Sequence, residues 1–316
     1  MPNLALASTG ITFPDSSVQT TAPSGFGFKN RIINGGFAID QRNAGASQSV
    51  SLGYTLDRWL LGSNVAVTSQ RVGSVGSYSW QITGASGNTG LTLIQRIESN
   101  NIGDLASQTV TFSFTASSST LTSLPIYYST PTAVDNYVST NSAVLVGTAT
   151  INASATRFSY TFTLPSTAIN GIQIYFSTGA LTSGTLTLSQ IQLEKGSTAT
   201  AFDYRPYGTE LALCQRYYCN SLSGSGYSPL TTVAALNLTF PVTMRTVPTI
   251  SITATLTITD GSANYTQSSA NSGSYLGTSL GGLLASISNF TGLTANRPNS
   301  TNANGFNNPI TASAEL

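Results

Sequence analysis

Thr109-Val-Thr-Phe-Ser-Phe-Thr-Ala116 alternates apolar and hydroxyl-bearing side chains without a break. In a strand, successive side chains point to opposite faces. One face of such a strand would therefore carry Val110, Phe112, Phe114 and Ala116. Strict period two over this length is typical of an antiparallel strand with one face buried and the other in water. This stretch predicts a β-structure with a half-buried sheet.

The same alternation recurs further along the chain. Residues 158–164 place Phe158, Tyr160, Phe162 and Leu164 in one phase, and residues 172–176 do the same with Ile172, Ile174 and Phe176. Many short strands with turn residues between them, and no convincing helical run, predict an all-β fold with an antiparallel jelly-roll β-sandwich. The best candidate for a helical turn lies at residues 210–218.

One predicted strand, residues 185–194, changes phase half-way. Its apolar side chains are Leu186 and Leu188 in one phase and Ile191 and Leu193 in the other. A slip of one residue exchanges the two faces of a strand. We therefore predict a β-bulge near Ser189–Gln190, where one extra residue restores a common buried face.

A second, smaller β-sandwich is predicted after residue 218. Its alternating residues are Leu236, Leu238, Phe240, Val242 and Met244 in one run and Ile250, Ile252, Ala254, Leu256 and Ile258 in the next. From Asp260 onward Ser, Asn and Gly dominate, with aromatic residues spaced through them. We expect long loops there.

Charge is scarce throughout the chain. Charged residues make up 7% of the 316 residues, and there is no histidine, whereas soluble domains usually hold roughly one quarter charged residues. The absence of histidine excludes Ser-His-Asp and Cys-His catalysis. The net charge of +1 gives no electrostatic case for binding nucleic acid or an anionic membrane. Cys214 and Cys219 match no zinc or disulfide pattern, so we expect ordinary thiols.

Nothing in the sequence indicates membrane insertion or export. No apolar run approaches the roughly 20 residues of a membrane span. The first ten residues lack the basic start and the long apolar stretch of a secretory signal. We expect a protein that is made and folded in a cytoplasm.

A glycosidase would need only two carboxylates. The candidates are Asp40, Asp57, Glu98, Asp104, Asp135, Glu194, Asp203 and Glu210. Three of these acids have an arginine nearby in the sequence: Asp40 with Arg42, Asp57 with Arg58 and Asp203 with Arg205. We expect ion pairs and turn caps that hold the ends of the sandwich, and no enzyme.

Several segments resemble a known family. Gly10-Ile-Thr-Phe-Pro-Asp-Ser-Ser-Val-Gln-Thr-Thr-Ala22 resembles a short N-terminal motif of bacteriophage tail-fibre and other virion proteins. Residues 30–37, 57–59 and 191–202 resemble the ends of the jelly roll found in such fibres, which is similar to carbohydrate-binding modules. Residues 204–218 look like the segment that closes the jelly roll, and residues 240–248 with 314–316 look like the small β tip that follows.

The resemblance implies a homotrimeric phage fibre in three parts. These are an N-terminal virion-attachment segment at residues 1–29, a carbohydrate-binding-module-like jelly roll at 30–208, and a C-terminal tip at 209–316 that starts with a short helical junction. The protein would belong to the virion and assemble in the cytoplasm of the host bacterium. The attachment candidates are Ile11, Phe13 and Val18. Jelly rolls of this kind often hold a structural Ca²⁺, for which Asp40 or Asp203 would be the candidates. The sequence shows no EF-hand-type cluster of ligands, so we expect no cofactor.

The tip is the place where we expect a receptor to bind. Tyr with Ser, Gly and Asn is the composition that recognition loops favour. The candidates are Tyr265, Asn271, Tyr275, Phe290, Asn296, Arg297, Asn302, Asn304 and Phe306. The alternative is that the rings only pin long loops to the core of the tip. Arg297 would either grip an anionic sugar or carboxylate, or pair with Glu315.

The other aromatic residues favour structural roles. We expect Trp59 and Trp80 in the core, and Tyr217 and Tyr218 at a contact between domains or subunits. Tyr127 and Tyr128 are adjacent in a predicted strand, so one of them should be exposed.

Three functions follow, of which the first is favoured. The chain would be a tail fibre that recognises a host surface glycan or outer protein. Alternatively it would be a structural fibre, or a capsid or tail decoration protein, that binds no receptor. A glycan depolymerase is disfavoured because the sequence shows no β-helix repeat.

Overall fold

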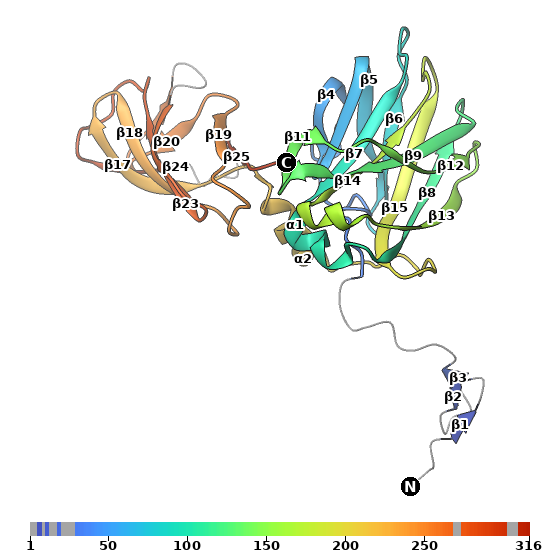
Figure 1. Cartoon of the computed structure of the whole chain (residues 1–316). Coiled ribbons are helices and arrows are strands. Elements are labelled where there is room, and N and C mark those ends of the chain that lie inside the picture. The colour runs from blue at the N-terminus through green and yellow to red at the C-terminus, as the bar shows by residue number, and fades with distance from the viewer. Residues whose placement is uncertain (1–4, 8–9, 13–17, 20–28, 268–272, 302–308) are drawn as a thin grey trace.

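The computed structural model describes residues 5–7, 10–12, 18–19, 29–267, 273–301 and 309–316. Two antiparallel β-domains lie beside each other (Figure 1). The large domain contains the strands between residues 48 and 195, and the small domain contains those between residues 218 and 313. Within the described residues, no helix has the length and apolar character needed to cross a membrane. The all-β prediction is confirmed.

A small antiparallel sheet lies near the N-terminus. It consists of β1 (Ala5–Ala7), β2 (Gly10–Thr12) and β3 (Val18–Gln19). Ile11 lies opposite Leu6 and Gln19, and Val18 lies opposite Thr12. Phe13, the third attachment candidate, lies outside the described residues.

The large domain is a ten-stranded antiparallel sheet that forms a near-barrel sandwich. Its strands, in spatial order, are β12 (Val144–Thr150), β9 (Ser123–Ser129), β14 (Ile172–Ser177), β7 (Leu91–Ile97), β5 (Trp59–Ser74), β6 (Ser77–Thr83), β15 (Thr185–Lys195), β8 (Thr109–Ser118) and β13 (Thr156–Thr163). Strand β4 (Gln48–Leu56) pairs with β5. The long strand β5 joins the two layers, because its first residues pair with β7 and its last with β6.

Aromatic rings fill the centre of the large domain. Phe37, Trp59 and Trp80 form one group with ring centroids 5.6 to 5.9 Å apart. Both indole N–H groups are satisfied: Trp59 donates to the Asn34 carbonyl oxygen at 3.1 Å, and Trp80 donates to Ser69 Oγ at 2.8 Å. The prediction that both tryptophans lie in the core is confirmed.

The alternating stretches form the strands that carry this core. Val110, Phe112 and Phe114 of β8 are fully buried. The equivalent side chains of β13 are only partly buried although they pack against the core. The reason is topological, because β13 is the last strand of its layer and its neighbour β8 covers one side only.

The predicted bulge in β15 is confirmed. Its pairing with β8 shifts between Ser189 and Gln192, and Gln190 adopts a left-handed backbone with φ of 50°. Leu186, Leu188, Ile191 and Leu193 are consequently all buried. The displaced Ile191 N–H donates to the Gly35 carbonyl oxygen at 2.9 Å instead of to a strand.

The segment before β4 fixes one end of the sandwich. The Asn30 amide donates to the Ile191 carbonyl oxygen at 3.0 Å and accepts from the Leu193 N–H at the same distance. Gly35 lies so close to β15 that a Cβ atom there would stand 2.0 Å from the Ile191 oxygen. Only glycine fits that position, which explains why the motif at residues 30–37 has glycine at residue 35.

Short elements complete the large domain. They are the helical turns α1 (Ser99–Ile102), η1 (Gly103–Leu105) and η2 (Ser166–Asn170), and a hairpin of β10 (Pro131–Ala133) and β11 (Asn136–Thr140). Tyr137 of the hairpin donates its hydroxyl to the Ile97 carbonyl oxygen at 2.6 Å. This bond ties the hairpin to the end of β7.

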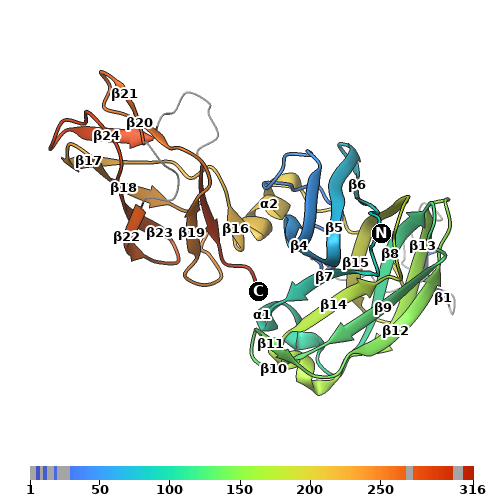
Figure 2. The same ribbon diagram turned by 90° about the horizontal axis from the view of Figure 1, so that it is seen from above.

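The small domain contains two antiparallel sheets around one core (Figure 2). The seven-stranded sheet runs in the order β21 (Asn264–Thr266), β20 (Thr257–Thr259), β24 (Pro298–Thr301), β17 (Gly224–Leu230), β18 (Val233–Thr239), β23 (Gly282–Ile287) and β22 (Gly273–Thr278). The three-stranded sheet consists of β16 (Tyr218–Cys219), β25 (Ile310–Ser313) and β19 (Thr249–Ile252).

Two expectations for the small domain were wrong. The alternating run 250–258 is not one strand: β19 and β20 belong to different sheets, and Ala254 between them is exposed. Where the structure describes the segment after Asp260, β21 to β25 make up about half of it, so strands interrupt the long loops that were expected there. These strands are three to six residues long and rich in Ser, Thr, Asn and Gly, so no long apolar alternation marks them.

A helix and the last residues of the chain join the two domains. Helix α2 (Tyr207–Gln215) overlaps the helical turn predicted at residues 210–218 but ends three residues earlier, and it begins before the predicted boundary at residue 209. The Glu315 carboxylate contacts the guanidinium groups of Arg42, at 2.9 Å, and Arg58. The guanidinium of Arg58 also lies 3.5 Å from the ring centre of Tyr217. Tyr217 is therefore the domain contact that the sequence predicted.

Both thiols are expected to resist alkylation in the native protein at pH 8. Burial raises the pKa of Cys219 to about 12 and that of Cys214 well above its usual value. The thiolate is the nucleophile. At pH 8 only about 10⁻⁴ of the Cys219 side chains are in the thiolate form, against roughly a quarter in the unfolded chain, so alkylation is slowed accordingly. Iodoacetamide labelling read by mass spectrometry, with and without urea, checks this. Labelling of either thiol at the unfolded rate would contradict the burial.

Candidate functional site

A row of apolar and aromatic side chains crosses the outer face of one layer of the large domain. The strand registers place these residues directly opposite one another in sequence across the sheet: Leu145, Tyr127, Tyr175, Ile94, Leu60 and Tyr54. They come from β12, β9, β14, β7, β5 and β4. We call this set the aromatic row.

The aromatic row faces away from the core. Its neighbours along the strands, such as Ile126, Ile174 and Leu93, are fully buried, whereas the members of the row are partly or largely exposed. Leu145 at one end is 53% exposed. The rings of Tyr127 and Tyr175 stack with centroids 5.5 Å apart and planes at 17°. Tyr127 is the more exposed member of the Tyr127–Tyr128 pair, because Tyr128 is buried.

The outer face of the other layer is different. The outward residues of β8 and β13 are almost all hydroxyl-bearing: Thr109, Thr111, Ser113, Thr115, Ser117, Ser159, Thr161 and Thr163. A hydroxyl-rich face keeps a sheet soluble. An unbroken apolar row on the opposite face is not needed for the core and calls for a separate explanation.

Neutral hydrogen-bonding groups border the aromatic row. Gln173, two residues before Tyr175, donates its amide to Ser129 Oγ at 2.8 Å, and Thr92 lies two residues from Ile94. Burial raises the pKa of Tyr175, with Tyr127 adding to the effect, so its hydroxyl stays protonated at neutral pH. Arg96 lies opposite Gln173 and also lines a hollow of about 320 Å³ between the domains.

The two ends of the row differ. At one end, the Tyr54 hydroxyl donates to the Leu316 backbone oxygen at 2.8 Å, and Arg42 lies over the Tyr54 ring. The last residues of the chain therefore cover this end. From Ile94 to Leu145 the row is open, which is three strand spacings or about 14 Å.

The predicted receptor residues of the tip that the structure describes differ in their surroundings. Phe290 is 1% exposed in the core of the small domain, so that candidate was wrong for a direct contact. Arg297 pairs with Asp260 at 3.2 Å and not with Glu315. Tyr265 donates to the same Asp260 at 3.1 Å and packs partly on the core, while Asn296 is exposed.

Other tip candidates cannot be placed. Asn271, Asn302, Asn304 and Phe306 lie outside the described residues, and of Tyr275 only the backbone is described, in β22 opposite Ala285. Their role in receptor contact stays a prediction.

The acidic residues of the large domain all have partners. Ion pairs form as expected, but mostly with partners distant in the sequence: Asp104 pairs with Arg31, Glu98 with Arg216 and Glu210 with Arg205. Arg42 and Arg58, near Asp40 and Asp57 in the sequence, reach Glu315 instead. The turn caps are confirmed: Asp40 accepts from the Gly45 N–H at 2.7 Å, and Asp203 from the Lys29 N–H at 2.9 Å. Each of Asp57, Glu98, Asp104, Asp135, Glu194 and Glu210 also accepts a hydrogen bond.

No metal cluster occurs in the part of the chain that the structure describes. No group of three acidic, cysteine or histidine side chains is close enough there to hold an ion. Asp40 and Asp203, the predicted Ca²⁺ ligands, use carboxylate oxygens for backbone N–H groups.

The large domain is similar in fold to several sugar-binding proteins. One, described as "CBM4 structure and function", is 20% identical, with a TM-score of 0.36, over 52% of this chain and 98% of that one. A family 11 carbohydrate-binding module from Clostridium thermocellum in complex with a mixed-linked tetrasaccharide is 13% identical, with a TM-score of 0.35, over 50% of this chain and 100% of its own.

A phage protein is among the similar structures. The enzymatically active domain of bacteriophage CBA120 tailspike protein 4 is 11% identical, with a TM-score of 0.34, over 53% of this chain and 21% of its own. No family model and no curated protein matches the chain. At these identities the likeness concerns the course of the chain and carries no ligand or activity over to it.

Most of the aromatic row escapes sequence reasoning. The sequence predicted that either Tyr127 or Tyr128 would be exposed, without saying which. A usable signal for Tyr175 exists: it is an aromatic residue at the outward position between Ile174 and Phe176, where a serine or threonine is usual in this chain. Nothing local marks Leu60 or Ile94, because their importance depends on which strands are neighbours.

Proposed function

We propose that the large domain binds a glycan on the open part of the aromatic row. The observation that carries the proposal is the in-register row of exposed apolar side chains, with the stacked pair Tyr127 and Tyr175 at its centre. A pyranose ring has an apolar face of C–H groups that packs on an aromatic ring and a rim of hydroxyl groups. The tyrosine rings, with the partly exposed Gln173 and Thr92 beside them, offer both kinds of contact.

The shape of the site favours a chain of sugars over a single one. The open row extends about 14 Å across the strands and is not enclosed. An extended oligosaccharide lying across the strands would place successive rings on Ile94, Tyr175 and Tyr127. The amide and hydroxyl groups at its border suit neutral hydroxyls.

We place this binding in a bacteriophage fibre because of the motifs quoted from the sequence. In this proposal the chain forms a homotrimer, residues 1–29 attach it to the virion, and no catalytic role is assigned. The acidic side chains of this domain hold loops in place. The Glu194 carboxylate, for example, accepts three hydrogen bonds, from Gln192 and Thr200. A structural fibre or decoration protein without receptor binding is the second candidate, favoured by the burial of Phe290.

A glycan array tests the proposal. The fluorescently labelled full-length protein is incubated with bacterial surface oligosaccharides, and host-cell adsorption of phage is measured with and without excess protein. Binding to extended oligosaccharides and blocked adsorption are expected. No glycan bound and no block by a folded protein would favour the structural role, and release of sugar from the array would refute the non-catalytic assignment.

A further inference from the structure

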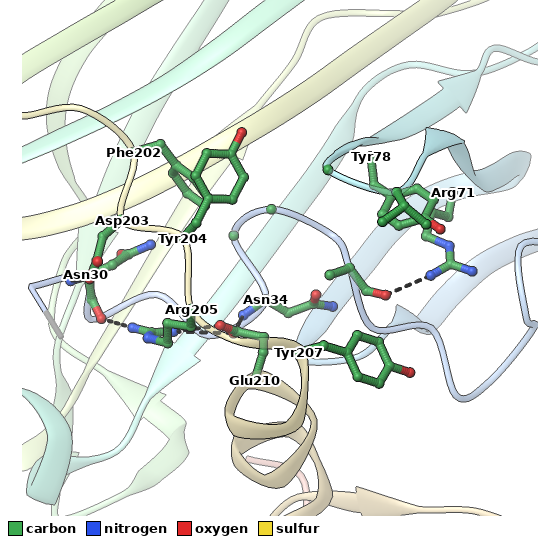
Figure 3. A pocket seen from close by; sticks show the side chains of 15 residues that line it. Asn30, Asn34, Arg71, Tyr78, Phe202, Asp203, Tyr204, Arg205, Tyr207 and Glu210 are labelled. Carbon is green, nitrogen blue, oxygen red and sulfur yellow. Dashed lines mark hydrogen bonds and ion pairs between the residues drawn. The ribbon is translucent and has the colours of Figure 1, made fainter.

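A second hollow lies at the other end of the large domain. It is a cavity of about 340 Å³ between the segment before β4, the hairpin of β5 and β6, and the start of helix α2 (Figure 3). None of its lining residues belongs to the aromatic row. Its size is within the range of small-ligand pockets, which is about 300 to 1,000 Å³.

Aromatic rings form two walls of this cavity. Figure 3 shows Tyr78 with Arg71 on one side and Phe202 with Tyr204 on the other. Phe202 and Tyr204 pack edge to face with centroids 4.7 Å apart, and Arg71 lies 4.5 Å from the ring centre of Tyr78. Both walls are therefore held in place without a ligand. Tyr204 is still 59% exposed.

The loop between the walls is bare backbone. Gly35 and Gly36 line the cavity, and a Cβ atom on Gly36 would stand 3.2 Å from the Phe202 ring. Because neither glycine carries a side chain, the space beside them stays open.

The charged groups that line the cavity are already engaged by partners in the protein. Arg205 pairs with Glu210 at 3.1 Å, and both are largely buried. Arg71 donates to the Ala38 carbonyl oxygen at 2.7 Å, and Asp203 accepts the Lys29 and Asn30 N–H groups. An ionic ligand would find its counter-charge already engaged, so the lining favours a neutral one.

A polar extension adjoins the cavity. A hollow of about 100 Å³ shares Gly36, Tyr78 and Tyr204 with it and is lined further by Ser77, Ser79, Ser189 and Gln190. Gln190, the bulge residue of β15, donates its amide to the Tyr204 hydroxyl at 2.8 Å. Hydroxyl and amide groups thus stand beside the aromatic walls.

We propose that this cavity is a second binding site, which takes one neutral pyranose ring. The ring would enter between Tyr78 and Tyr204 with its apolar face on an aromatic wall and its hydroxyls toward Ser77, Ser189 and Gln190. An enclosed site of this size suits a single or terminal sugar, in contrast to the open row. The inference does not depend on glycan binding at the aromatic row, since the two sites share no residue.

Saturation-transfer NMR on the full-length protein tests the cavity. The probes are methyl glucoside, methyl galactoside and the methyl glycoside of N-acetylglucosamine. For ligands of this size we expect at least one to bind with a dissociation constant on the order of 1 mM. Tyr204→Ala should weaken that binding about tenfold or more. Tyr227→Ala, which removes a 51% exposed tyrosine from the small domain, should leave it unchanged.

Two comparisons separate the possible outcomes. Tyr127→Ala with Tyr175→Ala should leave monosaccharide binding intact, so failure of the row and failure of the cavity are distinguishable. Binding of no probe, or equal binding by Tyr204→Ala, would overturn the proposal. If sedimentation shows that Tyr204→Ala lowers the oligomeric state, the cavity is a contact between copies of the chain and the sugar site is refuted.

Discussion

Replacing Glu315 with alanine is expected to lower the free energy of unfolding of the large domain by about 3 to 5 kcal/mol, because a buried arginine loses its counter-charge. The side chain of Arg58 is 1% exposed and that of Glu315 is 7% exposed. Arg58 also donates to the Arg96 carbonyl oxygen at 2.5 Å, so it cannot turn toward water without breaking a second contact. The cost is that of leaving a cation buried, which greatly exceeds the value of an exposed pair.

Urea unfolding followed by tryptophan fluorescence measures this loss. The chain has two tryptophans, Trp59 and Trp80, and both lie in the core of the large domain, so the signal reports that domain alone. The matched control is Asp104→Ala, which removes an acid that is 58% exposed and pairs with Arg31. It should cost less than about 1 kcal/mol.

Thiol labelling adds a readout at the junction. Cys214 belongs to the buried cluster that contains Tyr217, on which Arg58 stacks. Opening of the junction in Glu315→Ala should therefore speed alkylation of Cys214. Equal stability losses for Glu315→Ala and Asp104→Ala, with no change at Cys214, would show that the last residues do not hold the domains together.

Replacing both Tyr127 and Tyr175 with alanine is expected to weaken oligosaccharide binding by about 30- to 100-fold. Each aromatic anchor of a binding surface commonly contributes about 1.4 kcal/mol or more, which is a factor of ten. The two rings stack on each other, so the effects of the single variants need not add.

Isothermal titration with the oligosaccharide found on the array measures the change. The variants Tyr127→Phe and Tyr175→Phe keep the rings and should retain most of the affinity, whereas Tyr227→Ala in the small domain should have no effect. Tryptophan fluorescence verifies that the double variant is folded. A folded double variant with unchanged affinity would rule out the row as the binding surface.

Local alternation was enough to predict four strands of the large domain, which are β8, β13, β14 and β15, and the bulge in β15. Phe112, Phe114 and Ile174 are buried as their phase requires, and the phase change at Ser189–Gln190 has no other simple explanation. The small domain was harder. Its later strands are short and rich in small polar residues, so burial of Phe290 or Leu293 depends on tertiary packing that no local period reveals.

The candidate site could not be predicted in the same way. The aromatic row draws single residues from six strands that are far apart in the chain. Tyr127 meets Tyr175 only because β9 and β14 are neighbours, and that is a property of the strand order. The partners of the arginines were missed for the same reason, since Arg42 and Arg58 reach an acid more than 250 residues away.

The two ends of the small domain adjoin each other. Tyr218 and Cys219 pair with Ser313 and Ala312, and the Ala314 N–H donates to the Tyr217 carbonyl oxygen at 2.7 Å. The small domain from β16 to β25 therefore meets the large domain where the chain leaves α2 and where Glu315 reaches Arg58. A pull on the small domain would load the large domain through the chain itself and through this ion pair together.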